Sequence, residues 1–331
     1  SISFGNTKNS VEAVHSISFH INRNEILGVV GESGSGKSVT AMTILGLLPK
    51  KETLLDGELL FEGKDLLRQT YENLRKLRGS KIAMIFQEPM TALNPSMTCG
   101  EQVSEIIRLH LKQPKSKIKK EVISLFKKVK LPRPDEIYNS YPHQISGGQK
   151  QRVMIAIAIA CKPVLLIADE PTTALDVTVQ AQILDLLREL QKEFGTAIVL
   201  ITHDLGVVAD LADEVLVMYG GSAVEHAPVR EIFYEPQMPY TWGLLASIPQ
   251  ISAKKEQLDP IPGSPPSLLN MPKGCVFAPR CTFKDQVPGD ACANQLQDLL
   301  AVSADHEARC HLQLQPFLPA RLVGPSGLRG H

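Results

Sequence analysis

The chain has 331 residues, of which 43% are hydrophobic and 21% are charged, and its formal net charge is zero. This composition is typical of a globular protein with a buried core, and the length allows one large domain with an appendage or two ordinary domains. A zero net charge provides no overall field that would attract nucleic acid, so we expect no nucleic-acid partner. The longest apolar stretch, residues 153–161, is too short to cross a bilayer, and the first residues do not resemble a signal peptide. We therefore expect a soluble, cytoplasmic protein that would need another chain to form a membrane pore.

Strand-like and helical patterns alternate through the first two thirds of the chain. Short apolar runs predict buried strands at residues 26–30, 82–86, 164–168, 197–202 and 215–219. A glycine-rich loop follows the first run, and helical periodicity then continues to residue 47. Helical periodicity recurs at residues 99–131, 149–160 and 177–194, and Gly195 is the predicted C-cap of the last helix. This alternation predicts an α/β fold with a mainly parallel sheet.

Two segments interrupt or follow the alternating pattern. A helical block over about residues 88–162 predicts an inserted helical subdomain. Prolines become frequent beyond residue 227, which is typical of a loop-rich C-terminal extension. We therefore expect a core domain over residues 1–226 and an extension over residues 227–331.

The first strand is followed by a glycine-rich loop with the sequence GESGSGKS, residues 31–38. It fits the pattern G-x-x-x-x-G-K-S/T between a strand and a helix, in which backbone N–H groups and the helix N-terminus bind phosphate oxygens. The lysine would contact the β- and γ-phosphates, and the final serine would bind Mg²⁺. The alternative is a chance match, which the strand–loop–helix context disfavours. The residues predicted to bind the nucleotide are Gly31, Ser33, Gly34, Ser35, Gly36, Lys37 and Ser38.

A second apolar strand ends in two carboxylates, Asp169 and Glu170. Paired acids at the end of a buried strand usually have a cation or a substrate beside them, and this end of a parallel sheet faces the ligand crevice. We predict that Asp169 holds Mg²⁺ and that Glu170 orients and deprotonates an attacking water. The alternative is an acid pair that caps the following turn.

Two further polar residues, Gln87 and His203, also follow apolar strands. Each by itself would more often be a satisfied residue at the end of a strand than a catalytic one. In parallel strands of one sheet, however, all of these polar ends would meet at one edge. We therefore predict a shared site that contains both residues.

The segment YPHQISGGQKQR, residues 141–152, resembles the signature sequence of ABC ATPases, with Ile145 where leucine is commoner. A serine and glycine amides at the start of a helix form a second anion site, which a chain with one phosphate loop would not need by itself. The resemblance supplies the explanation, because two such domains pair head to tail and each signature caps the γ-phosphate held by the other. It implies nucleotide contacts from Ser146, Gly147, Gly148 and Gln149.

Other elements of the same family match in order, from Phe4 to about residue 225. The resemblance implies that Gln87 touches Mg²⁺ and reports to a membrane partner, and that His203 contacts the γ-phosphate. It further implies a D-loop at residues 174–176 with Asp176 at the nucleotide, and adenine stacking by Phe4.

The later segments PYTWGLL (residues 239–245), IPGSPP (residues 261–266) and GCVFAPRC (residues 274–281) resemble the ATPases of dipeptide, oligopeptide and nickel importers. This resemblance implies import of peptides, with nickel, glutathione or another small solute as the alternative. It implies as partners a second ATPase subunit, identical or related, two membrane permease subunits and a solute-binding protein outside the cell. The chain would then lie at the cytoplasmic face of the membrane.

Four of the six cysteines fall in the loop-rich extension. A segment with little core needs a cross-link, disulfides are disfavoured in the cytosol, and thiolates suit zinc or an iron–sulfur cluster. In the peptide-importer branch a similar tail carries a 4Fe-4S cluster, although the gap between the second and third cysteines is longer here. A cluster, zinc and free thiols all remain open for Cys275, Cys281, Cys292 and Cys310.

Two other classes compete with a transporter ATPase. A soluble ABC ATPase would usually carry both ATPase domains in one chain or a long coiled-coil insertion, and neither pattern occurs here. In a P-loop kinase or GTPase the serine–glycine–glycine–glutamine motif would have no purpose. The lysine-rich stretch over residues 112–130 is interpreted as a solvated helix face, with proximity to lipid headgroups as the alternative.

Overall fold

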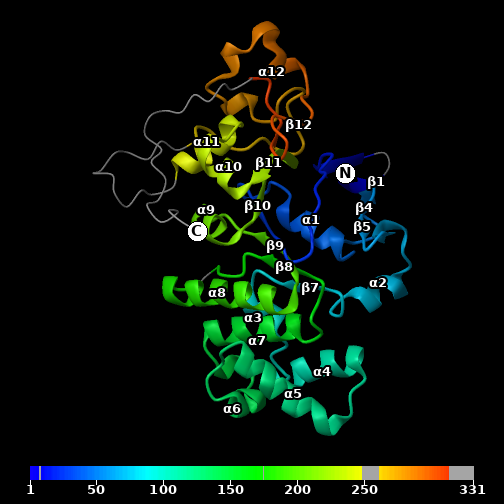
Figure 1. Cartoon of the computed structure of the whole chain (residues 1–331). Coiled ribbons are helices and arrows are strands. Elements are labelled where there is room, and N and C mark those ends of the chain that lie inside the picture. Colours follow the sequence, from blue (N-terminus) through cyan, green and yellow to red (C-terminus); the bar gives the residue numbers. More distant parts are fainter. Residues whose placement is uncertain (7–8, 174, 248–260, 313–331) are drawn as a thin grey trace.

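A computed structural model describes the chain except for residues 7–8, 174, 248–260 and 313–331. Figure 1 shows a central sheet with a group of helices at one end of the molecule and the C-terminal extension at the other. The predicted α/β fold with an inserted helical subdomain and a loop-rich extension is confirmed. None of the helices in the described ranges has the length and apolarity needed to cross a membrane.

Among the described residues the main sheet has eight strands in the order β12-β13-β11-β10-β3-β9-β8-β7. The neighbours from β10 to β7 pair in parallel, and the pairs that involve β11, β12 and β13 are antiparallel. The strands are β3 (Ile26–Val30), β7 (Ile82–Ile85), β8 (Leu165–Asp169), β9 (Ala197–Ile201), β10 (Glu214–Tyr219), β11 (Ser222–Pro228), β12 (Leu300–Ala301) and β13 (Glu307–Ala308). The five apolar runs therefore form the parallel part of the sheet, as predicted.

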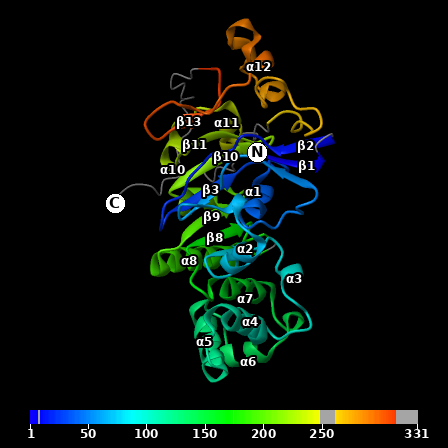
Figure 2. The same cartoon turned by 90° about the vertical axis from the view of Figure 1, so that its right-hand side faces the viewer.

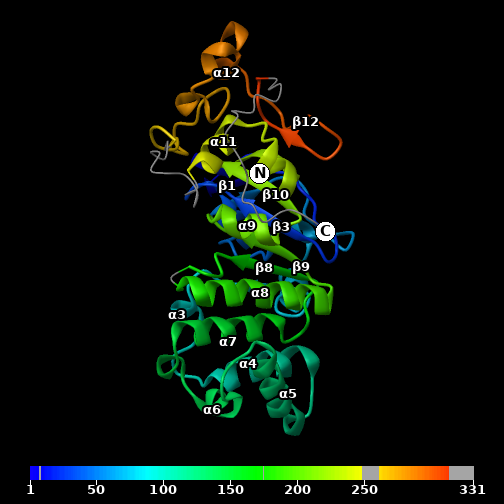
Figure 3. The same ribbon diagram turned by 60° about the vertical axis from the view of Figure 1, so that its left-hand side comes forward.

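These runs are continuously apolar because both faces of the sheet are covered. On β9, Ile198 and Leu200 belong to one hydrophobic cluster, whereas Val199 and Ile201 belong to another. The first cluster also contains side chains of α7 (Gly147–Ile159), α8 (Val177–Phe194) and α9 (Leu205–Leu211), and the second contains those of α1 (Lys37–Ile44). Figure 3 shows α7 and α8 running side by side and α9 in front of β3. Burial on both faces is the usual condition of a parallel sheet.

The helical end contains α3 (Pro89–Ala92), α4 (Cys99–Leu111), α5 (Lys115–Lys128), α6 (Pro134–Asn139) and the short 3₁₀ helix η2 (Pro142–Gln144) in addition to α7. Thr98 and Glu101 form a capping box that begins α4. The helical pattern over residues 99–131 is split, because Lys112 is left-handed at φ 49° and Pro114 is the extended N-cap of the next helix. Periodicity alone did not reveal this break.

Smaller elements flank the core beside α1. An antiparallel sheet has the order β2-β1-β4, and β5 and β6 form a hairpin. Figure 2 shows β1 and β2 beside one another above α1. These elements are β1 (Ile2–Asn6), β2 (Asn9–Val14), β4 (Thr53–Leu55), β5 (Leu60–Phe61), β6 (Lys64–Asp65), η1 (Leu66–Arg68) and α2 (Tyr71–Leu77).

The extension is built of short elements: α10 (Val229–Tyr234), α11 (Pro239–Ala246), η3 (Ala278–Arg280), η4 (Lys284–Gln286), η5 (Pro288–Asp290) and α12 (Ala291–Asn294). It is attached to the core through β13, which pairs with β11. Beside this pairing, the buried His306 lies 2.8 Å from Glu225 and 3.0 Å from Glu231. Because β11 runs from the core into this attachment, the domain division at residues 226 and 227 stays a prediction.

Candidate functional site

The glycine-rich loop over residues 31–38 lies between β3 and α1. Its sharp turns require glycine at two positions: Gly36 caps α1 at φ 98°, and a Cβ on Gly31 would lie 2.0 Å from the carbonyl oxygen of Met218. Ser33 and Gly34 are exposed, whereas Ser35 is buried. The exposed part of the loop can therefore contact a ligand, while its base is packed against β10.

The Lys37 ammonium is folded back into the loop. Its Nζ donates to the carbonyl oxygens of Gly31 and Glu32, both at 2.8 Å, and lies 3.4 Å from Ser35 Oγ. Burial lowers the pKa of Lys37, and the nearby charges of Glu170, Asp169 and Glu32 oppose that shift. A cation held by weak neutral acceptors inside a glycine loop is well placed to transfer its hydrogen bonds to phosphate oxygens.

Asp169 ends β8 directly opposite the start of α1. The Ser38 hydroxyl donates to Asp169 Oδ1 at 3.2 Å, and the aspartate is 3% exposed. Burial raises the pKa of Asp169, the charge of Glu170 adds to this, and Ser38 and Lys37 oppose it. A hydroxyl and a buried carboxylate are oxygen ligands that suit Mg²⁺, and a divalent cation would offset the cost of burying the charge. The donor set therefore fits the predicted metal.

Glu170 is the point at which the other polar residues meet. It adopts a left-handed backbone conformation, with φ 46°, directly after β8. Gln87 Nε2 donates to its carboxylate at 3.0 Å, Thr173 Oγ1 donates at 2.8 Å, and His203 Nδ1 lies 3.4 Å away. Burial would raise the pKa of Glu170, but the Thr173 and His203 hydrogen bonds, with the charges of His203 and Lys37, hold it below its usual value. An ionised carboxylate in this position can accept a proton from water.

The structure thus brings Gln87 and His203 together at Glu170, and their catalytic roles stay predictions. Thr173 was not predicted, because a threonine in a turn after a strand carries no pattern that separates it from an ordinary loop residue. Only the three-dimensional structure shows that Thr173 donates a hydrogen bond to Glu170.

The signature residues form a separate helix start. Ser146 is the N-cap of α7 and forms a capping box with Gln149, and a Cβ on Gly148 would approach Val179 to 2.9 Å. None of the hydrogen bonds recorded for the described residues joins positions 146–149 to the glycine-rich loop. The two predicted anion sites lie at the starts of α1 and α7, and Figures 1 and 2 show these helices in different parts of the chain.

Two other predicted nucleotide contacts have ordinary structural partners. Asp176 is the N-cap of α8 and accepts from the backbone N–H of Val179 at 2.9 Å. Ala174 of the predicted D-loop lies outside the described residues. Phe4 is a half-buried residue of β1 that pairs with Val11 and Thr53. Adenine stacking by Phe4 stays a prediction.

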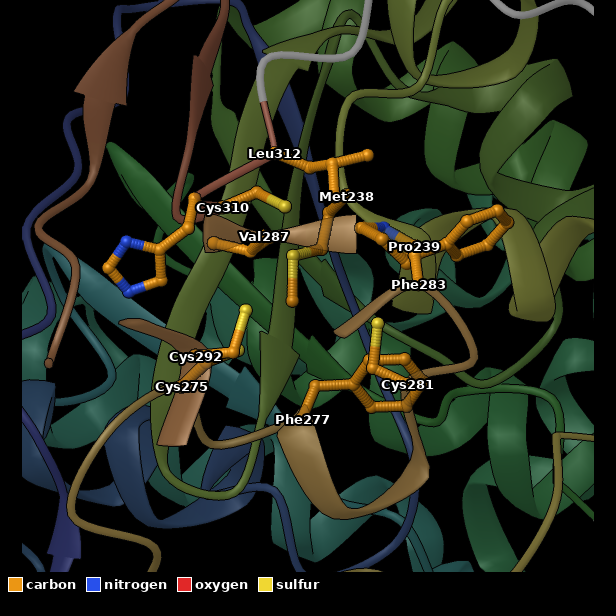
Figure 4. A pocket seen from close by; sticks show the side chains of 11 residues that line it. Met238, Pro239, Cys275, Phe277, Cys281, Phe283, Val287, Cys292, Cys310 and Leu312 are labelled. Atoms are coloured by element: carbon orange, nitrogen blue, oxygen red, sulfur yellow. The ribbon is translucent and has the colours of Figure 1, made fainter. Parts of the chain in front are cut away.

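The four cysteines of the extension line one small pocket, together with Met238, Phe277 and His311 among others. Figure 4 shows their side chains coming from separate turns toward a shared space that Met238 also enters. All four are free thiols, and burial raises the pKa of each, to about 12 for Cys310. The four donors are therefore of the right kind for a thiolate site. In the described ranges, however, no three cysteine, histidine or acidic side chains form a ready metal-binding group, so this arrangement does not support the iron–sulfur or zinc prediction.

Comparison with known families gives two matches. Residues 14–173 match the ABC transporter family, and residues 224–287 match the C-terminal region of oligopeptide and dipeptide transporters. The first match covers the glycine-rich loop, the signature and the acid pair. The second covers the turn with Cys275 and Cys281.

Individual relatives agree along nearly the whole chain. The chain is 52% identical to the oligopeptide transport ATP-binding protein OppD of Bacillus subtilis over 96% of its own length and 88% of that protein. It is 47% identical to the dipeptide transport ATP-binding protein DppD of the same organism, over 98% and 96%. Among solved structures, it resembles a dimeric ATP-binding cassette bound to ADP and phosphate in a post-hydrolysis state, with a TM-score of 0.61, 27% identity and coverage of 70% of this chain and 99% of that one.

The Lys37→Ala substitution tests the glycine-rich loop. Loss of the ammonium removes charge-assisted hydrogen bonds to phosphate, and we expect ATP affinity to fall by roughly 100-fold or more. Titration with a fluorescent ATP analogue measures this change. Lys117→Ala, at an exposed position of α5, is the matched control and should bind as the wild type does. An unchanged affinity in Lys37→Ala would remove Lys37 from the nucleotide site.

Proposed function

This chain belongs to the ABC transporter family, and we propose that it is the ATP-hydrolysing subunit of an importer that takes up oligopeptides or dipeptides. The observation that carries the proposal is the convergence of four strand ends on one site. Asp169 at the end of β8 contacts Ser38, which ends the glycine-rich loop after β3. Glu170, the next residue, contacts Gln87 after β7 and His203 after β9.

Different residues of this chain would bind the nucleotide, hold the metal and activate water. The amides and Lys37 of the glycine-rich loop hold the triphosphate, and Ser38 and Asp169 would hold Mg²⁺. When bound, the metal neutralises charge that develops on the phosphate oxygens. Glu170 aligns a water and accepts its proton. Gln87, which donates to the Glu170 carboxylate, would also touch Mg²⁺, and His203, which lies beside the same carboxylate, would contact the γ-phosphate.

A second copy or a related chain completes the site. Gly147 and Gly148 lie in the first turn of α7, where Ser146 and Gln149 form a capping box by bonding each other's backbone N–H groups. A helix start of this kind binds anions. In a head-to-tail pair it would meet the γ-phosphate held by the partner, and the dimeric state of the solved cassette supports this arrangement. Asp176 at the start of α8 and Phe4 on β1 are proposed to contact the same nucleotides.

The importer requires further chains. We propose two membrane permease subunits and an extracytoplasmic solute-binding protein, with this chain peripheral at the cytoplasmic membrane face. Peptide as the solute is supported by the functions of the relatives and by the match of the extension. Nickel, glutathione or another small solute is the alternative.

The Glu170→Gln substitution tests the catalytic assignment. It keeps the shape and a hydrogen-bond acceptor but removes the base, so ATP binding should persist while kcat falls by about 100-fold or more. The trapped ATP form should run as a dimer in size-exclusion chromatography. Glu189→Gln, which changes an exposed acid of α8 paired with Lys130, is the matched control. Normal hydrolysis by Glu170→Gln would remove Glu170 from this role.

Uptake in cells tests the solute. Replacing the wild-type chain by Glu170→Gln should abolish uptake of a labelled tripeptide and leave uptake of nickel unchanged. The intact complex, isolated in detergent through a tag on this chain, should contain two hydrophobic permease subunits. Loss of nickel uptake with retained peptide uptake would favour the alternative solute, and a complex without membrane subunits would contradict the transporter assignment.

We also propose that Cys275, Cys281, Cys292 and Cys310 hold a 4Fe-4S cluster, with zinc as the alternative. Four free thiols that line one pocket are donors of the right kind, although the described residues do not already form a metal-binding group. A bound cluster or zinc ion would order the loops by linking their thiolates.

Protein purified without oxygen should contain about four iron atoms per chain, and Cys292→Ser should lose them. Cys161→Ser, outside the pocket, is the control. Iron-free, colourless protein that contains zinc would establish the alternative, and protein free of both would leave free thiols.

A further inference from the structure

One residue of the glycine-rich loop carries a charge that nucleotide binding does not require. Glu32 follows Gly31, and its backbone carbonyl is one of the acceptors of the Lys37 ammonium. Its carboxylate is also close enough to Lys37 to influence the pKa of that lysine. A negative charge here would repel a triphosphate held by the same loop. The loop therefore needs something that neutralises Glu32.

The partner of Glu32 comes from the C-terminal extension, 248 positions away in the sequence. Arg280 Nη1 donates to Glu32 Oε2 at 2.7 Å, and Nη2 donates to Oε1 at 3.1 Å, so the salt bridge is bidentate. The side chain of Arg280 is 6% exposed and that of Glu32 is 25% exposed. A two-pronged, largely buried pair of this kind is among the stronger polar contacts and fixes orientation as well as charge.

Arg280 is itself held rigidly. Its guanidinium donates to the carbonyl oxygens of Pro262 at 2.7 Å and Ile261 at 3.3 Å, and to Tyr219 Oη at 3.2 Å. The ring of Tyr219 also lies against it, with 5.7 Å from the ring centre to Cζ. The donors of Arg280 are thus shared between the extension, the core strand β10 and the loop.

A second contact holds the same loop residue from the extension side. The backbone N–H of Glu32 donates to Tyr240 Oη at 2.9 Å, and Tyr240 on α11 is fully buried. Tyr240 packs against Tyr219, with ring centres 4.5 Å apart, and against Phe277 at 5.4 Å. Burial raises the pKa of Tyr240, so its hydroxyl stays neutral and can accept this bond. Both the charge and the backbone of Glu32 are therefore held by residues after β11.

We propose that Arg280 is a positioning residue for ATP, which the extension supplies to neutralise Glu32 and to fix the position of this residue in the glycine-rich loop. The inference rests on the proposed ATPase function. It gives the extension a direct role at the nucleotide, separate from whatever occupies the cysteine pocket. Its main consequence is that an unpaired Glu32 carboxylate weakens ATP binding, whereas removal of that charge restores it.

Four variants at two positions separate charge from general damage. Arg280→Gln leaves the carboxylate unpaired, and we expect the KM for ATP to rise by roughly tenfold with kcat changed by less than about twofold, because Glu170 is untouched. Glu32→Asp keeps the charge but shortens its reach to Arg280, so KM should rise by roughly five- to tenfold while the other bonds of Arg280 persist. Glu32→Gln removes the charge and should raise KM by only about two- to threefold. The double variant Glu32→Gln with Arg280→Gln should bind ATP better than Arg280→Gln alone.

The rescue is the decisive outcome, because a purely structural role of Arg280 would not be repaired by a change at Glu32. Arg309→Gln is the matched control: Arg309 is a similarly buried arginine of the extension, and its backbone N–H binds Val224. It should leave KM unchanged. If Arg280→Gln does not fold, the contrast between Glu32→Asp and Glu32→Gln decides the question.

Equal KM values for Glu32→Asp and Glu32→Gln, or a double variant no better than Arg280→Gln, would overturn the inference. Wild-type protein that fails to bind ATP would instead contradict the proposed function.

Discussion

The parallel pairing of β3, β9, β8 and β7 determines where each polar residue of the site can lie. Because all four strands point the same way, the loop after β3, the acids after β8 and the side chains after β7 and β9 emerge at one edge. The Ser38–Asp169 contact, at 3.2 Å, then links the start of α1 to the end of β8. Without this shared edge of the sheet, residues as far apart in the sequence as Lys37 and His203 could not contact the same ligand.

Much of this arrangement could be predicted from sequence because its signals are local. The apolar run of β8 ends in Asp169, and the glycine-rich loop has a fixed spacing that binds phosphate through the backbone. The helix α8 begins and ends as its periodicity and Gly195 predict. Each of these features depends on one continuous segment of the sequence, so it could be predicted without the tertiary structure.

Features that depend on distant pairing could not be predicted in this way. The break at Lys112 lies inside a periodic segment, and the partner of Glu32 is the last residue of η3, a three-residue helix that is too short to show a periodic pattern. The strand β13 is too short to give a period-two signal, and it forms by pairing with β11 on one side and β12 on the other. The cysteines are an intermediate case: their clustering in the sequence led us to expect a cross-link, and the four side chains line one pocket, but the geometry within it could not be predicted.

The edge of β11 has a consequence for shortening the chain. β11 pairs with β10 on one side and with β13 on the other, and the backbone N–H of Arg309 donates to its Val224 carbonyl. It also carries the fully buried Glu225, which accepts from the backbone N–H groups of Gln237 and Met238. A fragment that ended after β11 would leave the backbone groups that pair with β13 and Arg309 without partners and would expose the Glu225 carboxylate to solvent. Exposed strand edges recruit other chains. The isolated ATPase core should thus be prone to self-association through its sheet, and the extension serves as the cover of that edge.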